Sequence, residues 1–209
     1  MRTPKITRLQ VLETALILLE TEGIEGLTMR KLADALNIKA ASLYWHFNNK
    51  QALVEGMADH IVAMVAVDFQ YEDDWSTNLI KITSQLRNAL LKHRDGARVF
   101  AGTYIISDNV LRINNALIKT FMQAGIPVAS AASSTMTVFY FILGCCIEQQ
   151  AATFSADSDF INKESEFDQL SKEKFPYTWE AKEMLFANNY DERFLDGLKL
   201  IIDGLTNKG

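Results

Sequence analysis

The spacing of the apolar residues limits the fold of this chain more than any other feature of its sequence. Along most of its 209 residues they recur every three or four positions, which is the period of one face of an α-helix. No stretch alternates clearly between apolar and polar residues, as a half-buried strand would. Only three residues are proline, which breaks helices. The sequence therefore predicts an all-α fold.

Glycine, proline and short polar stretches divide the chain into the expected helices. Thr28 and Asn49 are the expected N-caps of the second and fourth of them. The polar segment 154–177, which a proline interrupts, is expected to be a mobile loop. Helices are expected at residues 6–22, 29–36, 40–46, 51–68, 75–92, 97–104, 107–124, 127–152, 178–186 and 191–207.

Charge is distributed unevenly, although the 21 basic and 26 acidic residues give a net charge of −5. Residues 1–50 hold seven basic and five acidic residues, whereas residues 51–209 hold 14 and 21. The N-terminal part can therefore face a polyanion that the acidic chain as a whole would repel.

The cysteine usage and the apolar segments favour a reducing, cytoplasmic location. Cys145 and Cys146 are adjacent, a spacing that suits neither a disulfide nor a metal site. The N-terminus shows no apolar stretch followed by a cleavage site. Residues 120–147 carry no charge, but only residues 138–147 are strongly apolar, too few to cross a bilayer core of about 30 Å. We therefore expect a helix buried in a core or a subunit interface, and no membrane partner.

Residues 27–53, LTMRKLADALNIKAASLYWHFNNKQAL, have the pattern of a helix-turn-helix. Their very short third helix concentrates hydroxyl, indole, imidazole and ammonium donors, which suit DNA phosphates. Arg30 can make two hydrogen bonds to a guanine edge. The alternative is that Tyr44 and Trp45 are core aromatics of an ordinary bundle. The predicted DNA-binding residues are Thr28, Arg30, Lys39, Ala40, Ala41, Ser42, Tyr44, Trp45, His46 and Lys50.

This segment resembles the DNA-binding domain of TetR-family repressors, whose recognition helix commonly carries Leu-Tyr-x-His-Phe and then Asn-Lys. A thinner likeness to the tetracycline repressors of that family extends over most of the chain, including residues 90–97, Gly102, Thr103 and residues 143–145. The residues that match the recognition motif are Leu43, Tyr44, His46, Phe47, Asn49 and Lys50.

The resemblance implies a ligand-responsive repressor that binds a palindromic double-stranded DNA operator as a homodimer. We expect a three-helix, helix-turn-helix DNA-binding domain at residues 1–50. A larger helical domain for effector binding and dimerisation is expected at residues 51–209, with the helix at 51–68 connecting the two. A short recognition helix reads few base pairs, so two-fold pairing is expected. The apolar stripe at residues 194–205 and the uncharged helix at residues 127–147 would form a four-helix dimer interface.

The resemblance also implies where a small effector would bind. Apolar side chains replace most of the polar groups that tetracycline repressors use, and Phe100 stands where they have a metal-binding histidine. Because a magnesium chelate requires oxygen and imidazole donors, we expect no magnesium-tetracycline, no metal and no other cofactor. A lipophilic or aromatic effector is expected instead, with a cationic group accommodated if Glu148 faces it. The implied effector-binding residues are Ala66, Ile82, Leu86, Phe100, Thr103, Tyr104, Leu117, Phe139 and Glu148.

An enzyme is the rival class of function. The three histidines lie in no metal-ligand or nucleophile pattern, and no phosphate loop, Cys-x-x-Cys or Gly-x-Ser-x-Gly motif is present. We therefore expect no enzymatic activity. A helical ligand-binding or interaction protein that does not bind DNA is the alternative function, but it leaves the donors between Arg30 and Lys50 unexplained.

Overall fold

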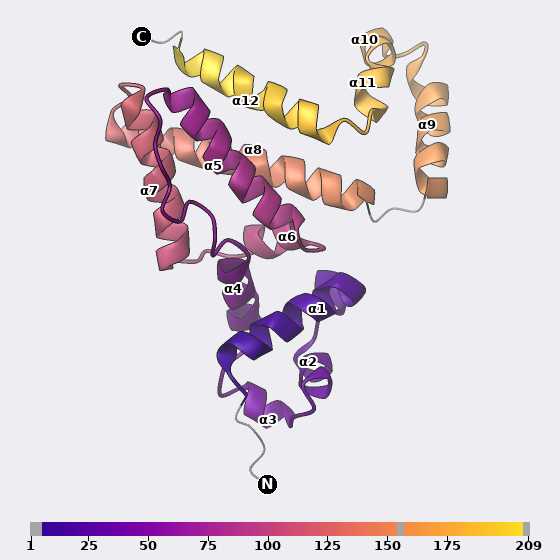
Figure 1. Cartoon of the computed structure of the whole chain (residues 1–209). Helices are drawn as coiled ribbons and strands as arrows, with labels where there is room; N and C mark the ends of the chain where they lie inside the picture. The colour runs from indigo at the N-terminus through magenta and orange to yellow at the C-terminus, as the bar shows by residue number, and fades with distance from the viewer. Residues whose placement is uncertain (1–5, 154–156, 207–209) are drawn as a thin grey trace. The chain divides into compact units, whose positions relative to one another are not determined.

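The computed structural model describes residues 6–153 and 157–206, and every regular element in them is an α-helix (Figure 1). The expected all-α fold class is therefore confirmed. The chain forms two compact units, Met1–Ile147 and Glu148–Gly209. The domain boundary expected at residue 50 stays a prediction, because the helix that follows it packs against helices on both sides.

Helices α1 (Arg8–Gly26), α2 (Met29–Ala35) and α3 (Ala40–Leu43) form a small N-terminal bundle. The expected caps are confirmed, because the side chain of Thr28 accepts from the N–H of Lys31 at 3.2 Å and that of Asn49 from Ala52 at 2.8 Å. Helix α3 ends earlier than the expected residue 46, and a turn follows it. The buried side chains that hold the bundle together include Val11, Leu19, Leu27, Leu32, Leu43 and Phe47.

Helix α4 (Lys50–Ile61) packs against both α1 and α6 but ends well before the expected residue 68. Its continuation is prevented because other elements bind the backbone there. The Arg112 side chain donates to the carbonyls of Ala63 and Val65 at 2.6 and 3.0 Å, and Gln85 accepts from the N–H of Ala66 at 2.9 Å. Ala66 then takes a left-handed φ of 54°. The connecting helix expected at 51–68 is therefore wrong in its second half.

Helices α5 (Trp75–Leu91), α6 (Gly96–Ala101), α7 (Asp108–Gln123) and α8 (Val128–Thr153) complete most of the first unit. Helix α6 ends three residues before the expected position, so residues 103–106 run without regular structure into α7. Helix α5 packs on α6 and α7. The buried side chains between these helices include Leu79, Ile82, Leu86, Leu117 and Phe121.

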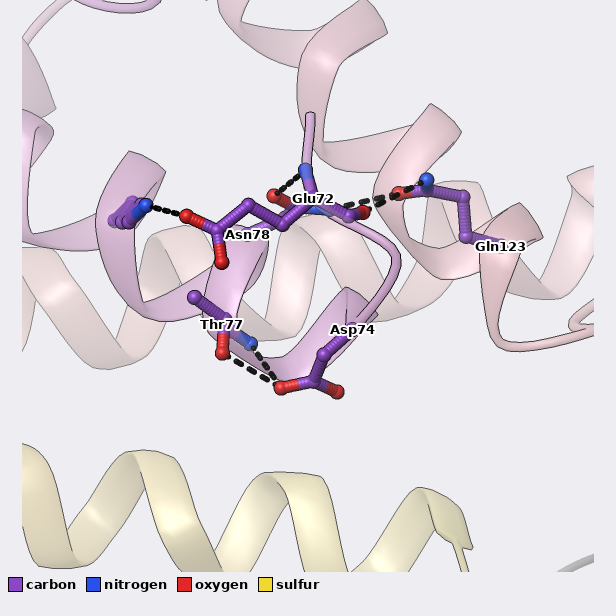
Figure 2. Close-up of polar contacts among 6 residues, drawn as sticks. Glu72, Asp74, Thr77, Asn78 and Gln123 are labelled. Atoms are coloured by element: carbon purple, nitrogen blue, oxygen red, sulfur yellow. Dashed lines mark hydrogen bonds and ion pairs between the residues drawn. The ribbon is translucent and has the colours of Figure 1, made fainter. Parts of the chain in front are cut away.

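A polar network fixes the loop before α5 (Figure 2). Buried Asn78 accepts from the N–H of Glu72 at 2.9 Å and donates to its carbonyl at 2.8 Å, as a neighbouring strand would. Its amide also donates to Gln123 on α7 at 3.1 Å. Asp74 caps α5, with its carboxylate accepting from the N–H and the hydroxyl of Thr77 at 3.1 and 2.6 Å. One amide therefore joins the loop to two helices.

The second unit corrects the expected loop at residues 154–177. It contains α9 (Asp157–Ser171), α10 (Pro176–Glu180), α11 (Lys182–Phe186) and α12 (Tyr190–Thr206), while residues 154–156 lie outside the described part. Phe167 on α9 stacks on Trp179 and meets Phe186 edge-on, with centroids 6.5 and 5.0 Å apart. Lys182 pairs with Asp168 and Glu164, and these two carboxylates raise its pKa. These partners come from later in the chain, so local periodicity does not reveal the helix.

Helix α8 is long and apolar enough to cross a membrane by length and composition, and only a third of its most apolar window is buried. The core helix of a soluble protein passes the same test, so one such helix is weak evidence for a membrane span. Thr135 is consistent with a core helix, because its side chain is buried and its hydroxyl donates to the Ala131 carbonyl at 2.9 Å.

Candidate functional site

The short helix α3 presents one face to solvent and anchors the other in the bundle. Leu43 and Phe47 are buried, and the Arg8 guanidinium lies 4.2 Å above the Phe47 ring. Arg8 also donates to the His46 carbonyl at 3.1 Å, which holds the turn after α3. The predicted residues Lys39, Ala40, Ala41, Ser42, Tyr44 and Trp45 are all exposed, and His46 is half-buried.

Trp45 is 89% exposed and Tyr44 is 48% exposed. The reading of these two residues as core aromatics is therefore wrong for this chain. A large aromatic side chain left in water beside exposed hydroxyl and ammonium groups is typical of a binding surface. We name the exposed residues Arg30, Lys39, Ala40, Ala41, Ser42, Tyr44 and Trp45 the α3 face.

The charges near the α3 face divide into paired and unpaired groups. Within the described residues, Arg30 and Lys39 are exposed and make no hydrogen bond or ion pair. Lys31 is bound to Glu22, and Lys50 donates to the Ile24 carbonyl at 3.3 Å. The two unpaired cations are thus available to an anion from outside the chain.

The acidic end of α1 is bound by residues just before and within α6. His93 Nδ1 lies 3.0 Å from Glu20 Oε1, and the Arg98 guanidinium pairs with Glu25 at 2.7 Å. The N–H of Ile24 donates to Asp95 Oδ2 at 2.9 Å. Glu20 and Glu25, whose carboxylates would repel DNA phosphates, are therefore bound by His93 and Arg98 of the larger part of the unit.

A second polar junction joins α4 to the start of α7. The Asp59 carboxylate accepts from Ser107 Oγ at 2.5 Å and from Asn109 Nδ2 at 3.0 Å. Arg112 continues this junction by binding the carbonyls of Ala63 and Val65 and the Asn109 side chain. We call Asp59, Ser107, Asn109 and Arg112 the α4–α7 clasp.

A cavity of about 380 Å³ opens between the end of α6, the 103–106 segment, α7 and α8. Its volume falls within the range of small-molecule sites. The rings of Phe100 and Phe139 are parallel, with 3° between their planes and 6.2 Å between their centroids. The residues that line it are Phe100, Thr103, Tyr104, Ile105, Ile106, Val110, Asn114, Met136 and Phe139.

Four of the expected effector residues, Phe100, Thr103, Tyr104 and Phe139, line this cavity together. The remaining five lie elsewhere. Glu148 pairs with Arg193 at 3.2 Å within the second unit. The other four are buried side chains outside the lining of this cavity, namely Ala66, Ile82, Leu86 and Leu117.

Sequence reasoning missed the joint at Asp95, the α4–α7 clasp and five of the residues that line the cavity, namely Ile105, Ile106, Val110, Asn114 and Met136. Asn114 lies four residues after Val110, so helical spacing places both on one face of α7 once either is known to line the cavity. The joint and the clasp connect residues about 50 to 70 positions apart, and no local pattern in the sequence marks them.

The cavity does not fit a magnesium chelate. Its lining contains no imidazole and no carboxylate, the donors that such an ion requires. Within residues 6–153 and 157–206, no group of three or more His, Cys, Asp or Glu residues could hold a metal ion.

Comparisons with known proteins agree with this arrangement over nearly the whole chain. The model of bacterial regulatory proteins of the tetR family matches residues 11–57, and the model of a tetracyclin repressor-like C-terminal domain matches residues 70–208. The tetracycline repressor protein class A from transposon 1721 of Escherichia coli is 35% identical over 211 residues. That match covers 97% of this chain and 93% of the relative.

Solved structures show the same similarity. A possible TetR family transcriptional regulator from Streptomyces coelicolor A3(2) is 34% identical, with a TM-score of 0.86 over 97% of this chain and all of that chain. ActR of Streptomyces coelicolor in complex with actinorhodin is 25% identical, with a TM-score of 0.85 over 97% and 98%. BioQ, known from Mycobacterium smegmatis, has been solved with its double-stranded DNA operator. It is 27% identical, with a TM-score of 0.70 over 97% and 99%.

Proposed function

The chain belongs to the TetR family of transcriptional regulators, and from this membership we propose that it is a homodimeric repressor of a palindromic operator, released by a small, mostly apolar effector. Members of this family are DNA-binding repressors with a ligand-binding C-terminal domain, and they are not enzymes. Because the proposed partner is DNA, we expect a cytoplasmic location.

The observation that carries the DNA-binding proposal is the α3 face. Its exposed groups come from α3, from the residues that flank α3 and from Arg30 on α2, and buried Leu43 anchors α3 in the bundle. Arg30 is available for a guanine edge, and Lys39 for a phosphate. BioQ, a relative by structure, was solved with its operator, which supports the same use of this domain here.

Dimerisation through α8 and α12 is supported by the apolar side chains that each helix leaves exposed. Leu200 on α12 is 74% exposed, and Tyr140 on α8 is 70% exposed. Two copies would cover such residues by packing these helices as a four-helix interface. Pairing would also place two α3 faces on the two halves of a palindrome.

The effector proposal rests on the cavity and on its neighbours along the chain. Phe100, at the end of α6, lies five residues after Asp95, which is bonded to α1, and the 103–106 segment leads directly into the clasp that holds α4. A ligand that moves α6 or the 103–106 segment would therefore shift the helices of the DNA-binding bundle. By linkage, DNA would weaken effector binding by the same factor.

We further propose that magnesium-tetracycline is not the effector, although several relatives are tetracycline repressors. The cavity lining supplies aromatic and aliphatic surface where a chelate would require imidazole and carboxylate. ActR was solved with actinorhodin, which is consistent with the choice of a mostly apolar effector.

Selection of bound duplexes from a random DNA library by the full-length protein tests this function. We expect enrichment of a two-fold symmetric sequence bound by one dimer, and release of that DNA by an apolar compound that binds the protein. The Arg30→Ala variant tests base recognition, and it should lose discrimination at one position of each half-site. Failure to enrich any sequence would overturn the repressor assignment, and tight magnesium-dependent tetracycline binding would overturn the effector assignment.

A further inference from the structure

We propose that the cavity takes an uncharged, flat aromatic molecule of two or three rings that carries a hydroxyl or N–H group, and that Asn114 recognises this donor. The inference rests on the proposed function, because it assumes that the cavity is the effector site. It adds the charge, the size and the hydrogen-bonding sense of the ligand.

The ligand must be uncharged because nothing in the cavity compensates an ion. The nine lining residues include no Asp, Glu, Lys, Arg or His. An ion moved from water into such a site loses hydration without gaining a counter-charge. Glu148, which could have balanced a cation, is instead paired with Arg193 at 3.2 Å.

The walls of the cavity fit a flat ring system. Phe100 and Phe139 are already parallel to within 3°, so a planar aromatic can stack on one ring without disturbing the other. Met136 adds a thioether, which makes favourable contacts with aromatic rings. A cavity of about 150 Å³ holds one benzene, so the 380 Å³ here suits two or three fused rings.

One polar atom of the cavity residues requires a donor from the ligand. Asn114 Oδ1 is buried and has no hydrogen-bond partner. An unmet buried acceptor costs about 1–3 kcal/mol. The Thr103 hydroxyl already donates to the Phe100 carbonyl at 2.7 Å, so only its lone pairs are left. A partial rotation of the Asn114 amide about its Cβ–Cγ bond would bring this oxygen within reach of a ligand hydroxyl or N–H, which would meet this need.

Three naphthalene probes separate these requirements in calorimetric titrations of the full-length protein. 2-Naphthol is flat, neutral at pH 7 and carries a donor, 2-methoxynaphthalene has the same shape without the donor, and 2-naphthoate is anionic. We expect 2-naphthol to bind on the order of tenfold more tightly than the ether. No binding of 2-naphthoate is expected at 100 times the Kd of 2-naphthol.

The Asn114→Leu variant tests the residue itself, because leucine has similar size and no polar atoms. The preference for 2-naphthol over the ether should fall to about onefold, while binding of the ether stays within about twofold of the parent protein. Asn115→Leu changes the adjacent, exposed amide and is the matched control, with the preference unchanged. A thermal melt of each variant checks that it folds.

Three results would overturn the inference: no probe binds up to its solubility limit, 2-naphthoate binds as tightly as 2-naphthol, or the hydroxyl preference survives in Asn114→Leu. Release of operator DNA is measured separately. If 2-naphthol binds with the expected pattern and no ligand releases DNA, the repressor mechanism fails and the ligand assignment stands. If ligands without a donor release the DNA, the ligand assignment fails and the repressor mechanism stands.

Discussion

The backbone N–H of Ile24 donates a hydrogen bond to Asp95 Oδ2 across 2.9 Å, joining the end of α1 to the start of α6. Gly23 permits this approach because its φ is 64°, and a Cβ built there would lie 3.0 Å from the same carboxylate oxygen. The backbone of Asp95 also has a left-handed conformation, with a φ of 56°. The proposed path from the effector cavity to the DNA-binding bundle therefore runs through two residues in an unusual backbone conformation.

Asp95→Ala should lower the free energy of unfolding by about 2–3 kcal/mol. The partly buried Ile24 N–H loses its acceptor, which costs about 1–3 kcal/mol, and alanine tolerates the left-handed region poorly. Asp95→Asn keeps an acceptor oxygen and tolerates this conformation, so it should lose less than about 1 kcal/mol. Guanidinium unfolding of both variants measures the difference. Equal losses in the two would contradict the role given to the Ile24 hydrogen bond.

Trp45→Ala should weaken binding to the selected operator while leaving stability unchanged. At 89% exposure the side chain buries little within the chain, so unfolding should shift by less than about 0.5 kcal/mol. A lost indole hydrogen bond to phosphate should cost about 1.5–3 kcal/mol of binding. Phe47→Ala is the contrasting variant, because this buried ring should cost about 3–5 kcal/mol of stability. Fluorescence anisotropy gives the DNA affinity, and unfolding curves give the stability. Parent-like DNA affinity in Trp45→Ala would contradict the proposal that Trp45 contacts DNA.

Local sequence pattern was sufficient for the elements whose partners lie nearby in the chain. The caps at Thr28 and Asn49 depend on atoms three residues away, and each was predicted. The end of α4 was not, because Arg112 binds the carbonyls of Ala63 and Val65 from nearly 50 residues downstream. The sequence predicts a loop at residues 154–177, where α9 forms, for the same reason, because the residues that α9 contacts lie later in the chain.

The cavity was predicted in part, and the reason is physical. Four of its residues were expected from the family resemblance, and the structure brings them together. The sequence does not single out Asn114, because an asparagine on a helix is usually solvated and Asn115 beside it is exposed. Only the position of Asn114 beside Val110 and Met136, with its buried oxygen unpaired, distinguishes it. Such a property depends on tertiary packing and not on the residue's neighbours in sequence.

Arg30→Ala and Lys39→Ala should differ in how they weaken DNA binding. Arg30 is proposed to read a base, so its loss should cost about 1–3 kcal/mol at one operator position and relax specificity there. Lys39 is proposed to meet a phosphate, so its loss should weaken all sequences alike and reduce the salt slope by about one. Affinities at several salt concentrations, on the operator and on single-base variants, separate the two. Lys81→Ala on α5 is the control and should change neither quantity, and indistinguishable patterns would contradict the assignment.

Asp74 should contribute to stability above pH 4 and lose that contribution in acid. Hydrogen bonds from Thr77 and Ser76 lower its pKa from 3.8 to about 2. A carboxyl with a lowered folded-state pKa stabilises the fold above its unfolded pKa and ceases to do so as the pH falls through about 2. Asp74→Ala should therefore flatten the acid side of the stability profile, measured as urea midpoints from pH 2 to 6. Asp73→Ala, an exposed neighbour, should preserve the parent profile, and an unchanged slope in Asp74→Ala would contradict the cap's role.

Cys146 should resist alkylation in the folded protein. Burial raises the pKa of its thiol to about 12, although nearby Arg87 acts in the opposite direction. At pH 8 only about one thiol in ten thousand is then ionised, and the side chain is shielded from reagent as well. The Cys145→Ala variant carries this thiol alone, and Cys146→Ala carries the half-buried Cys145. Mass spectrometry after iodoacetamide treatment should show slow labelling of the first variant, faster labelling of the second, and equal labelling of both in 6 M guanidinium. Labelling of Cys146 at the rate of free cysteine would mean that α8 opens around it.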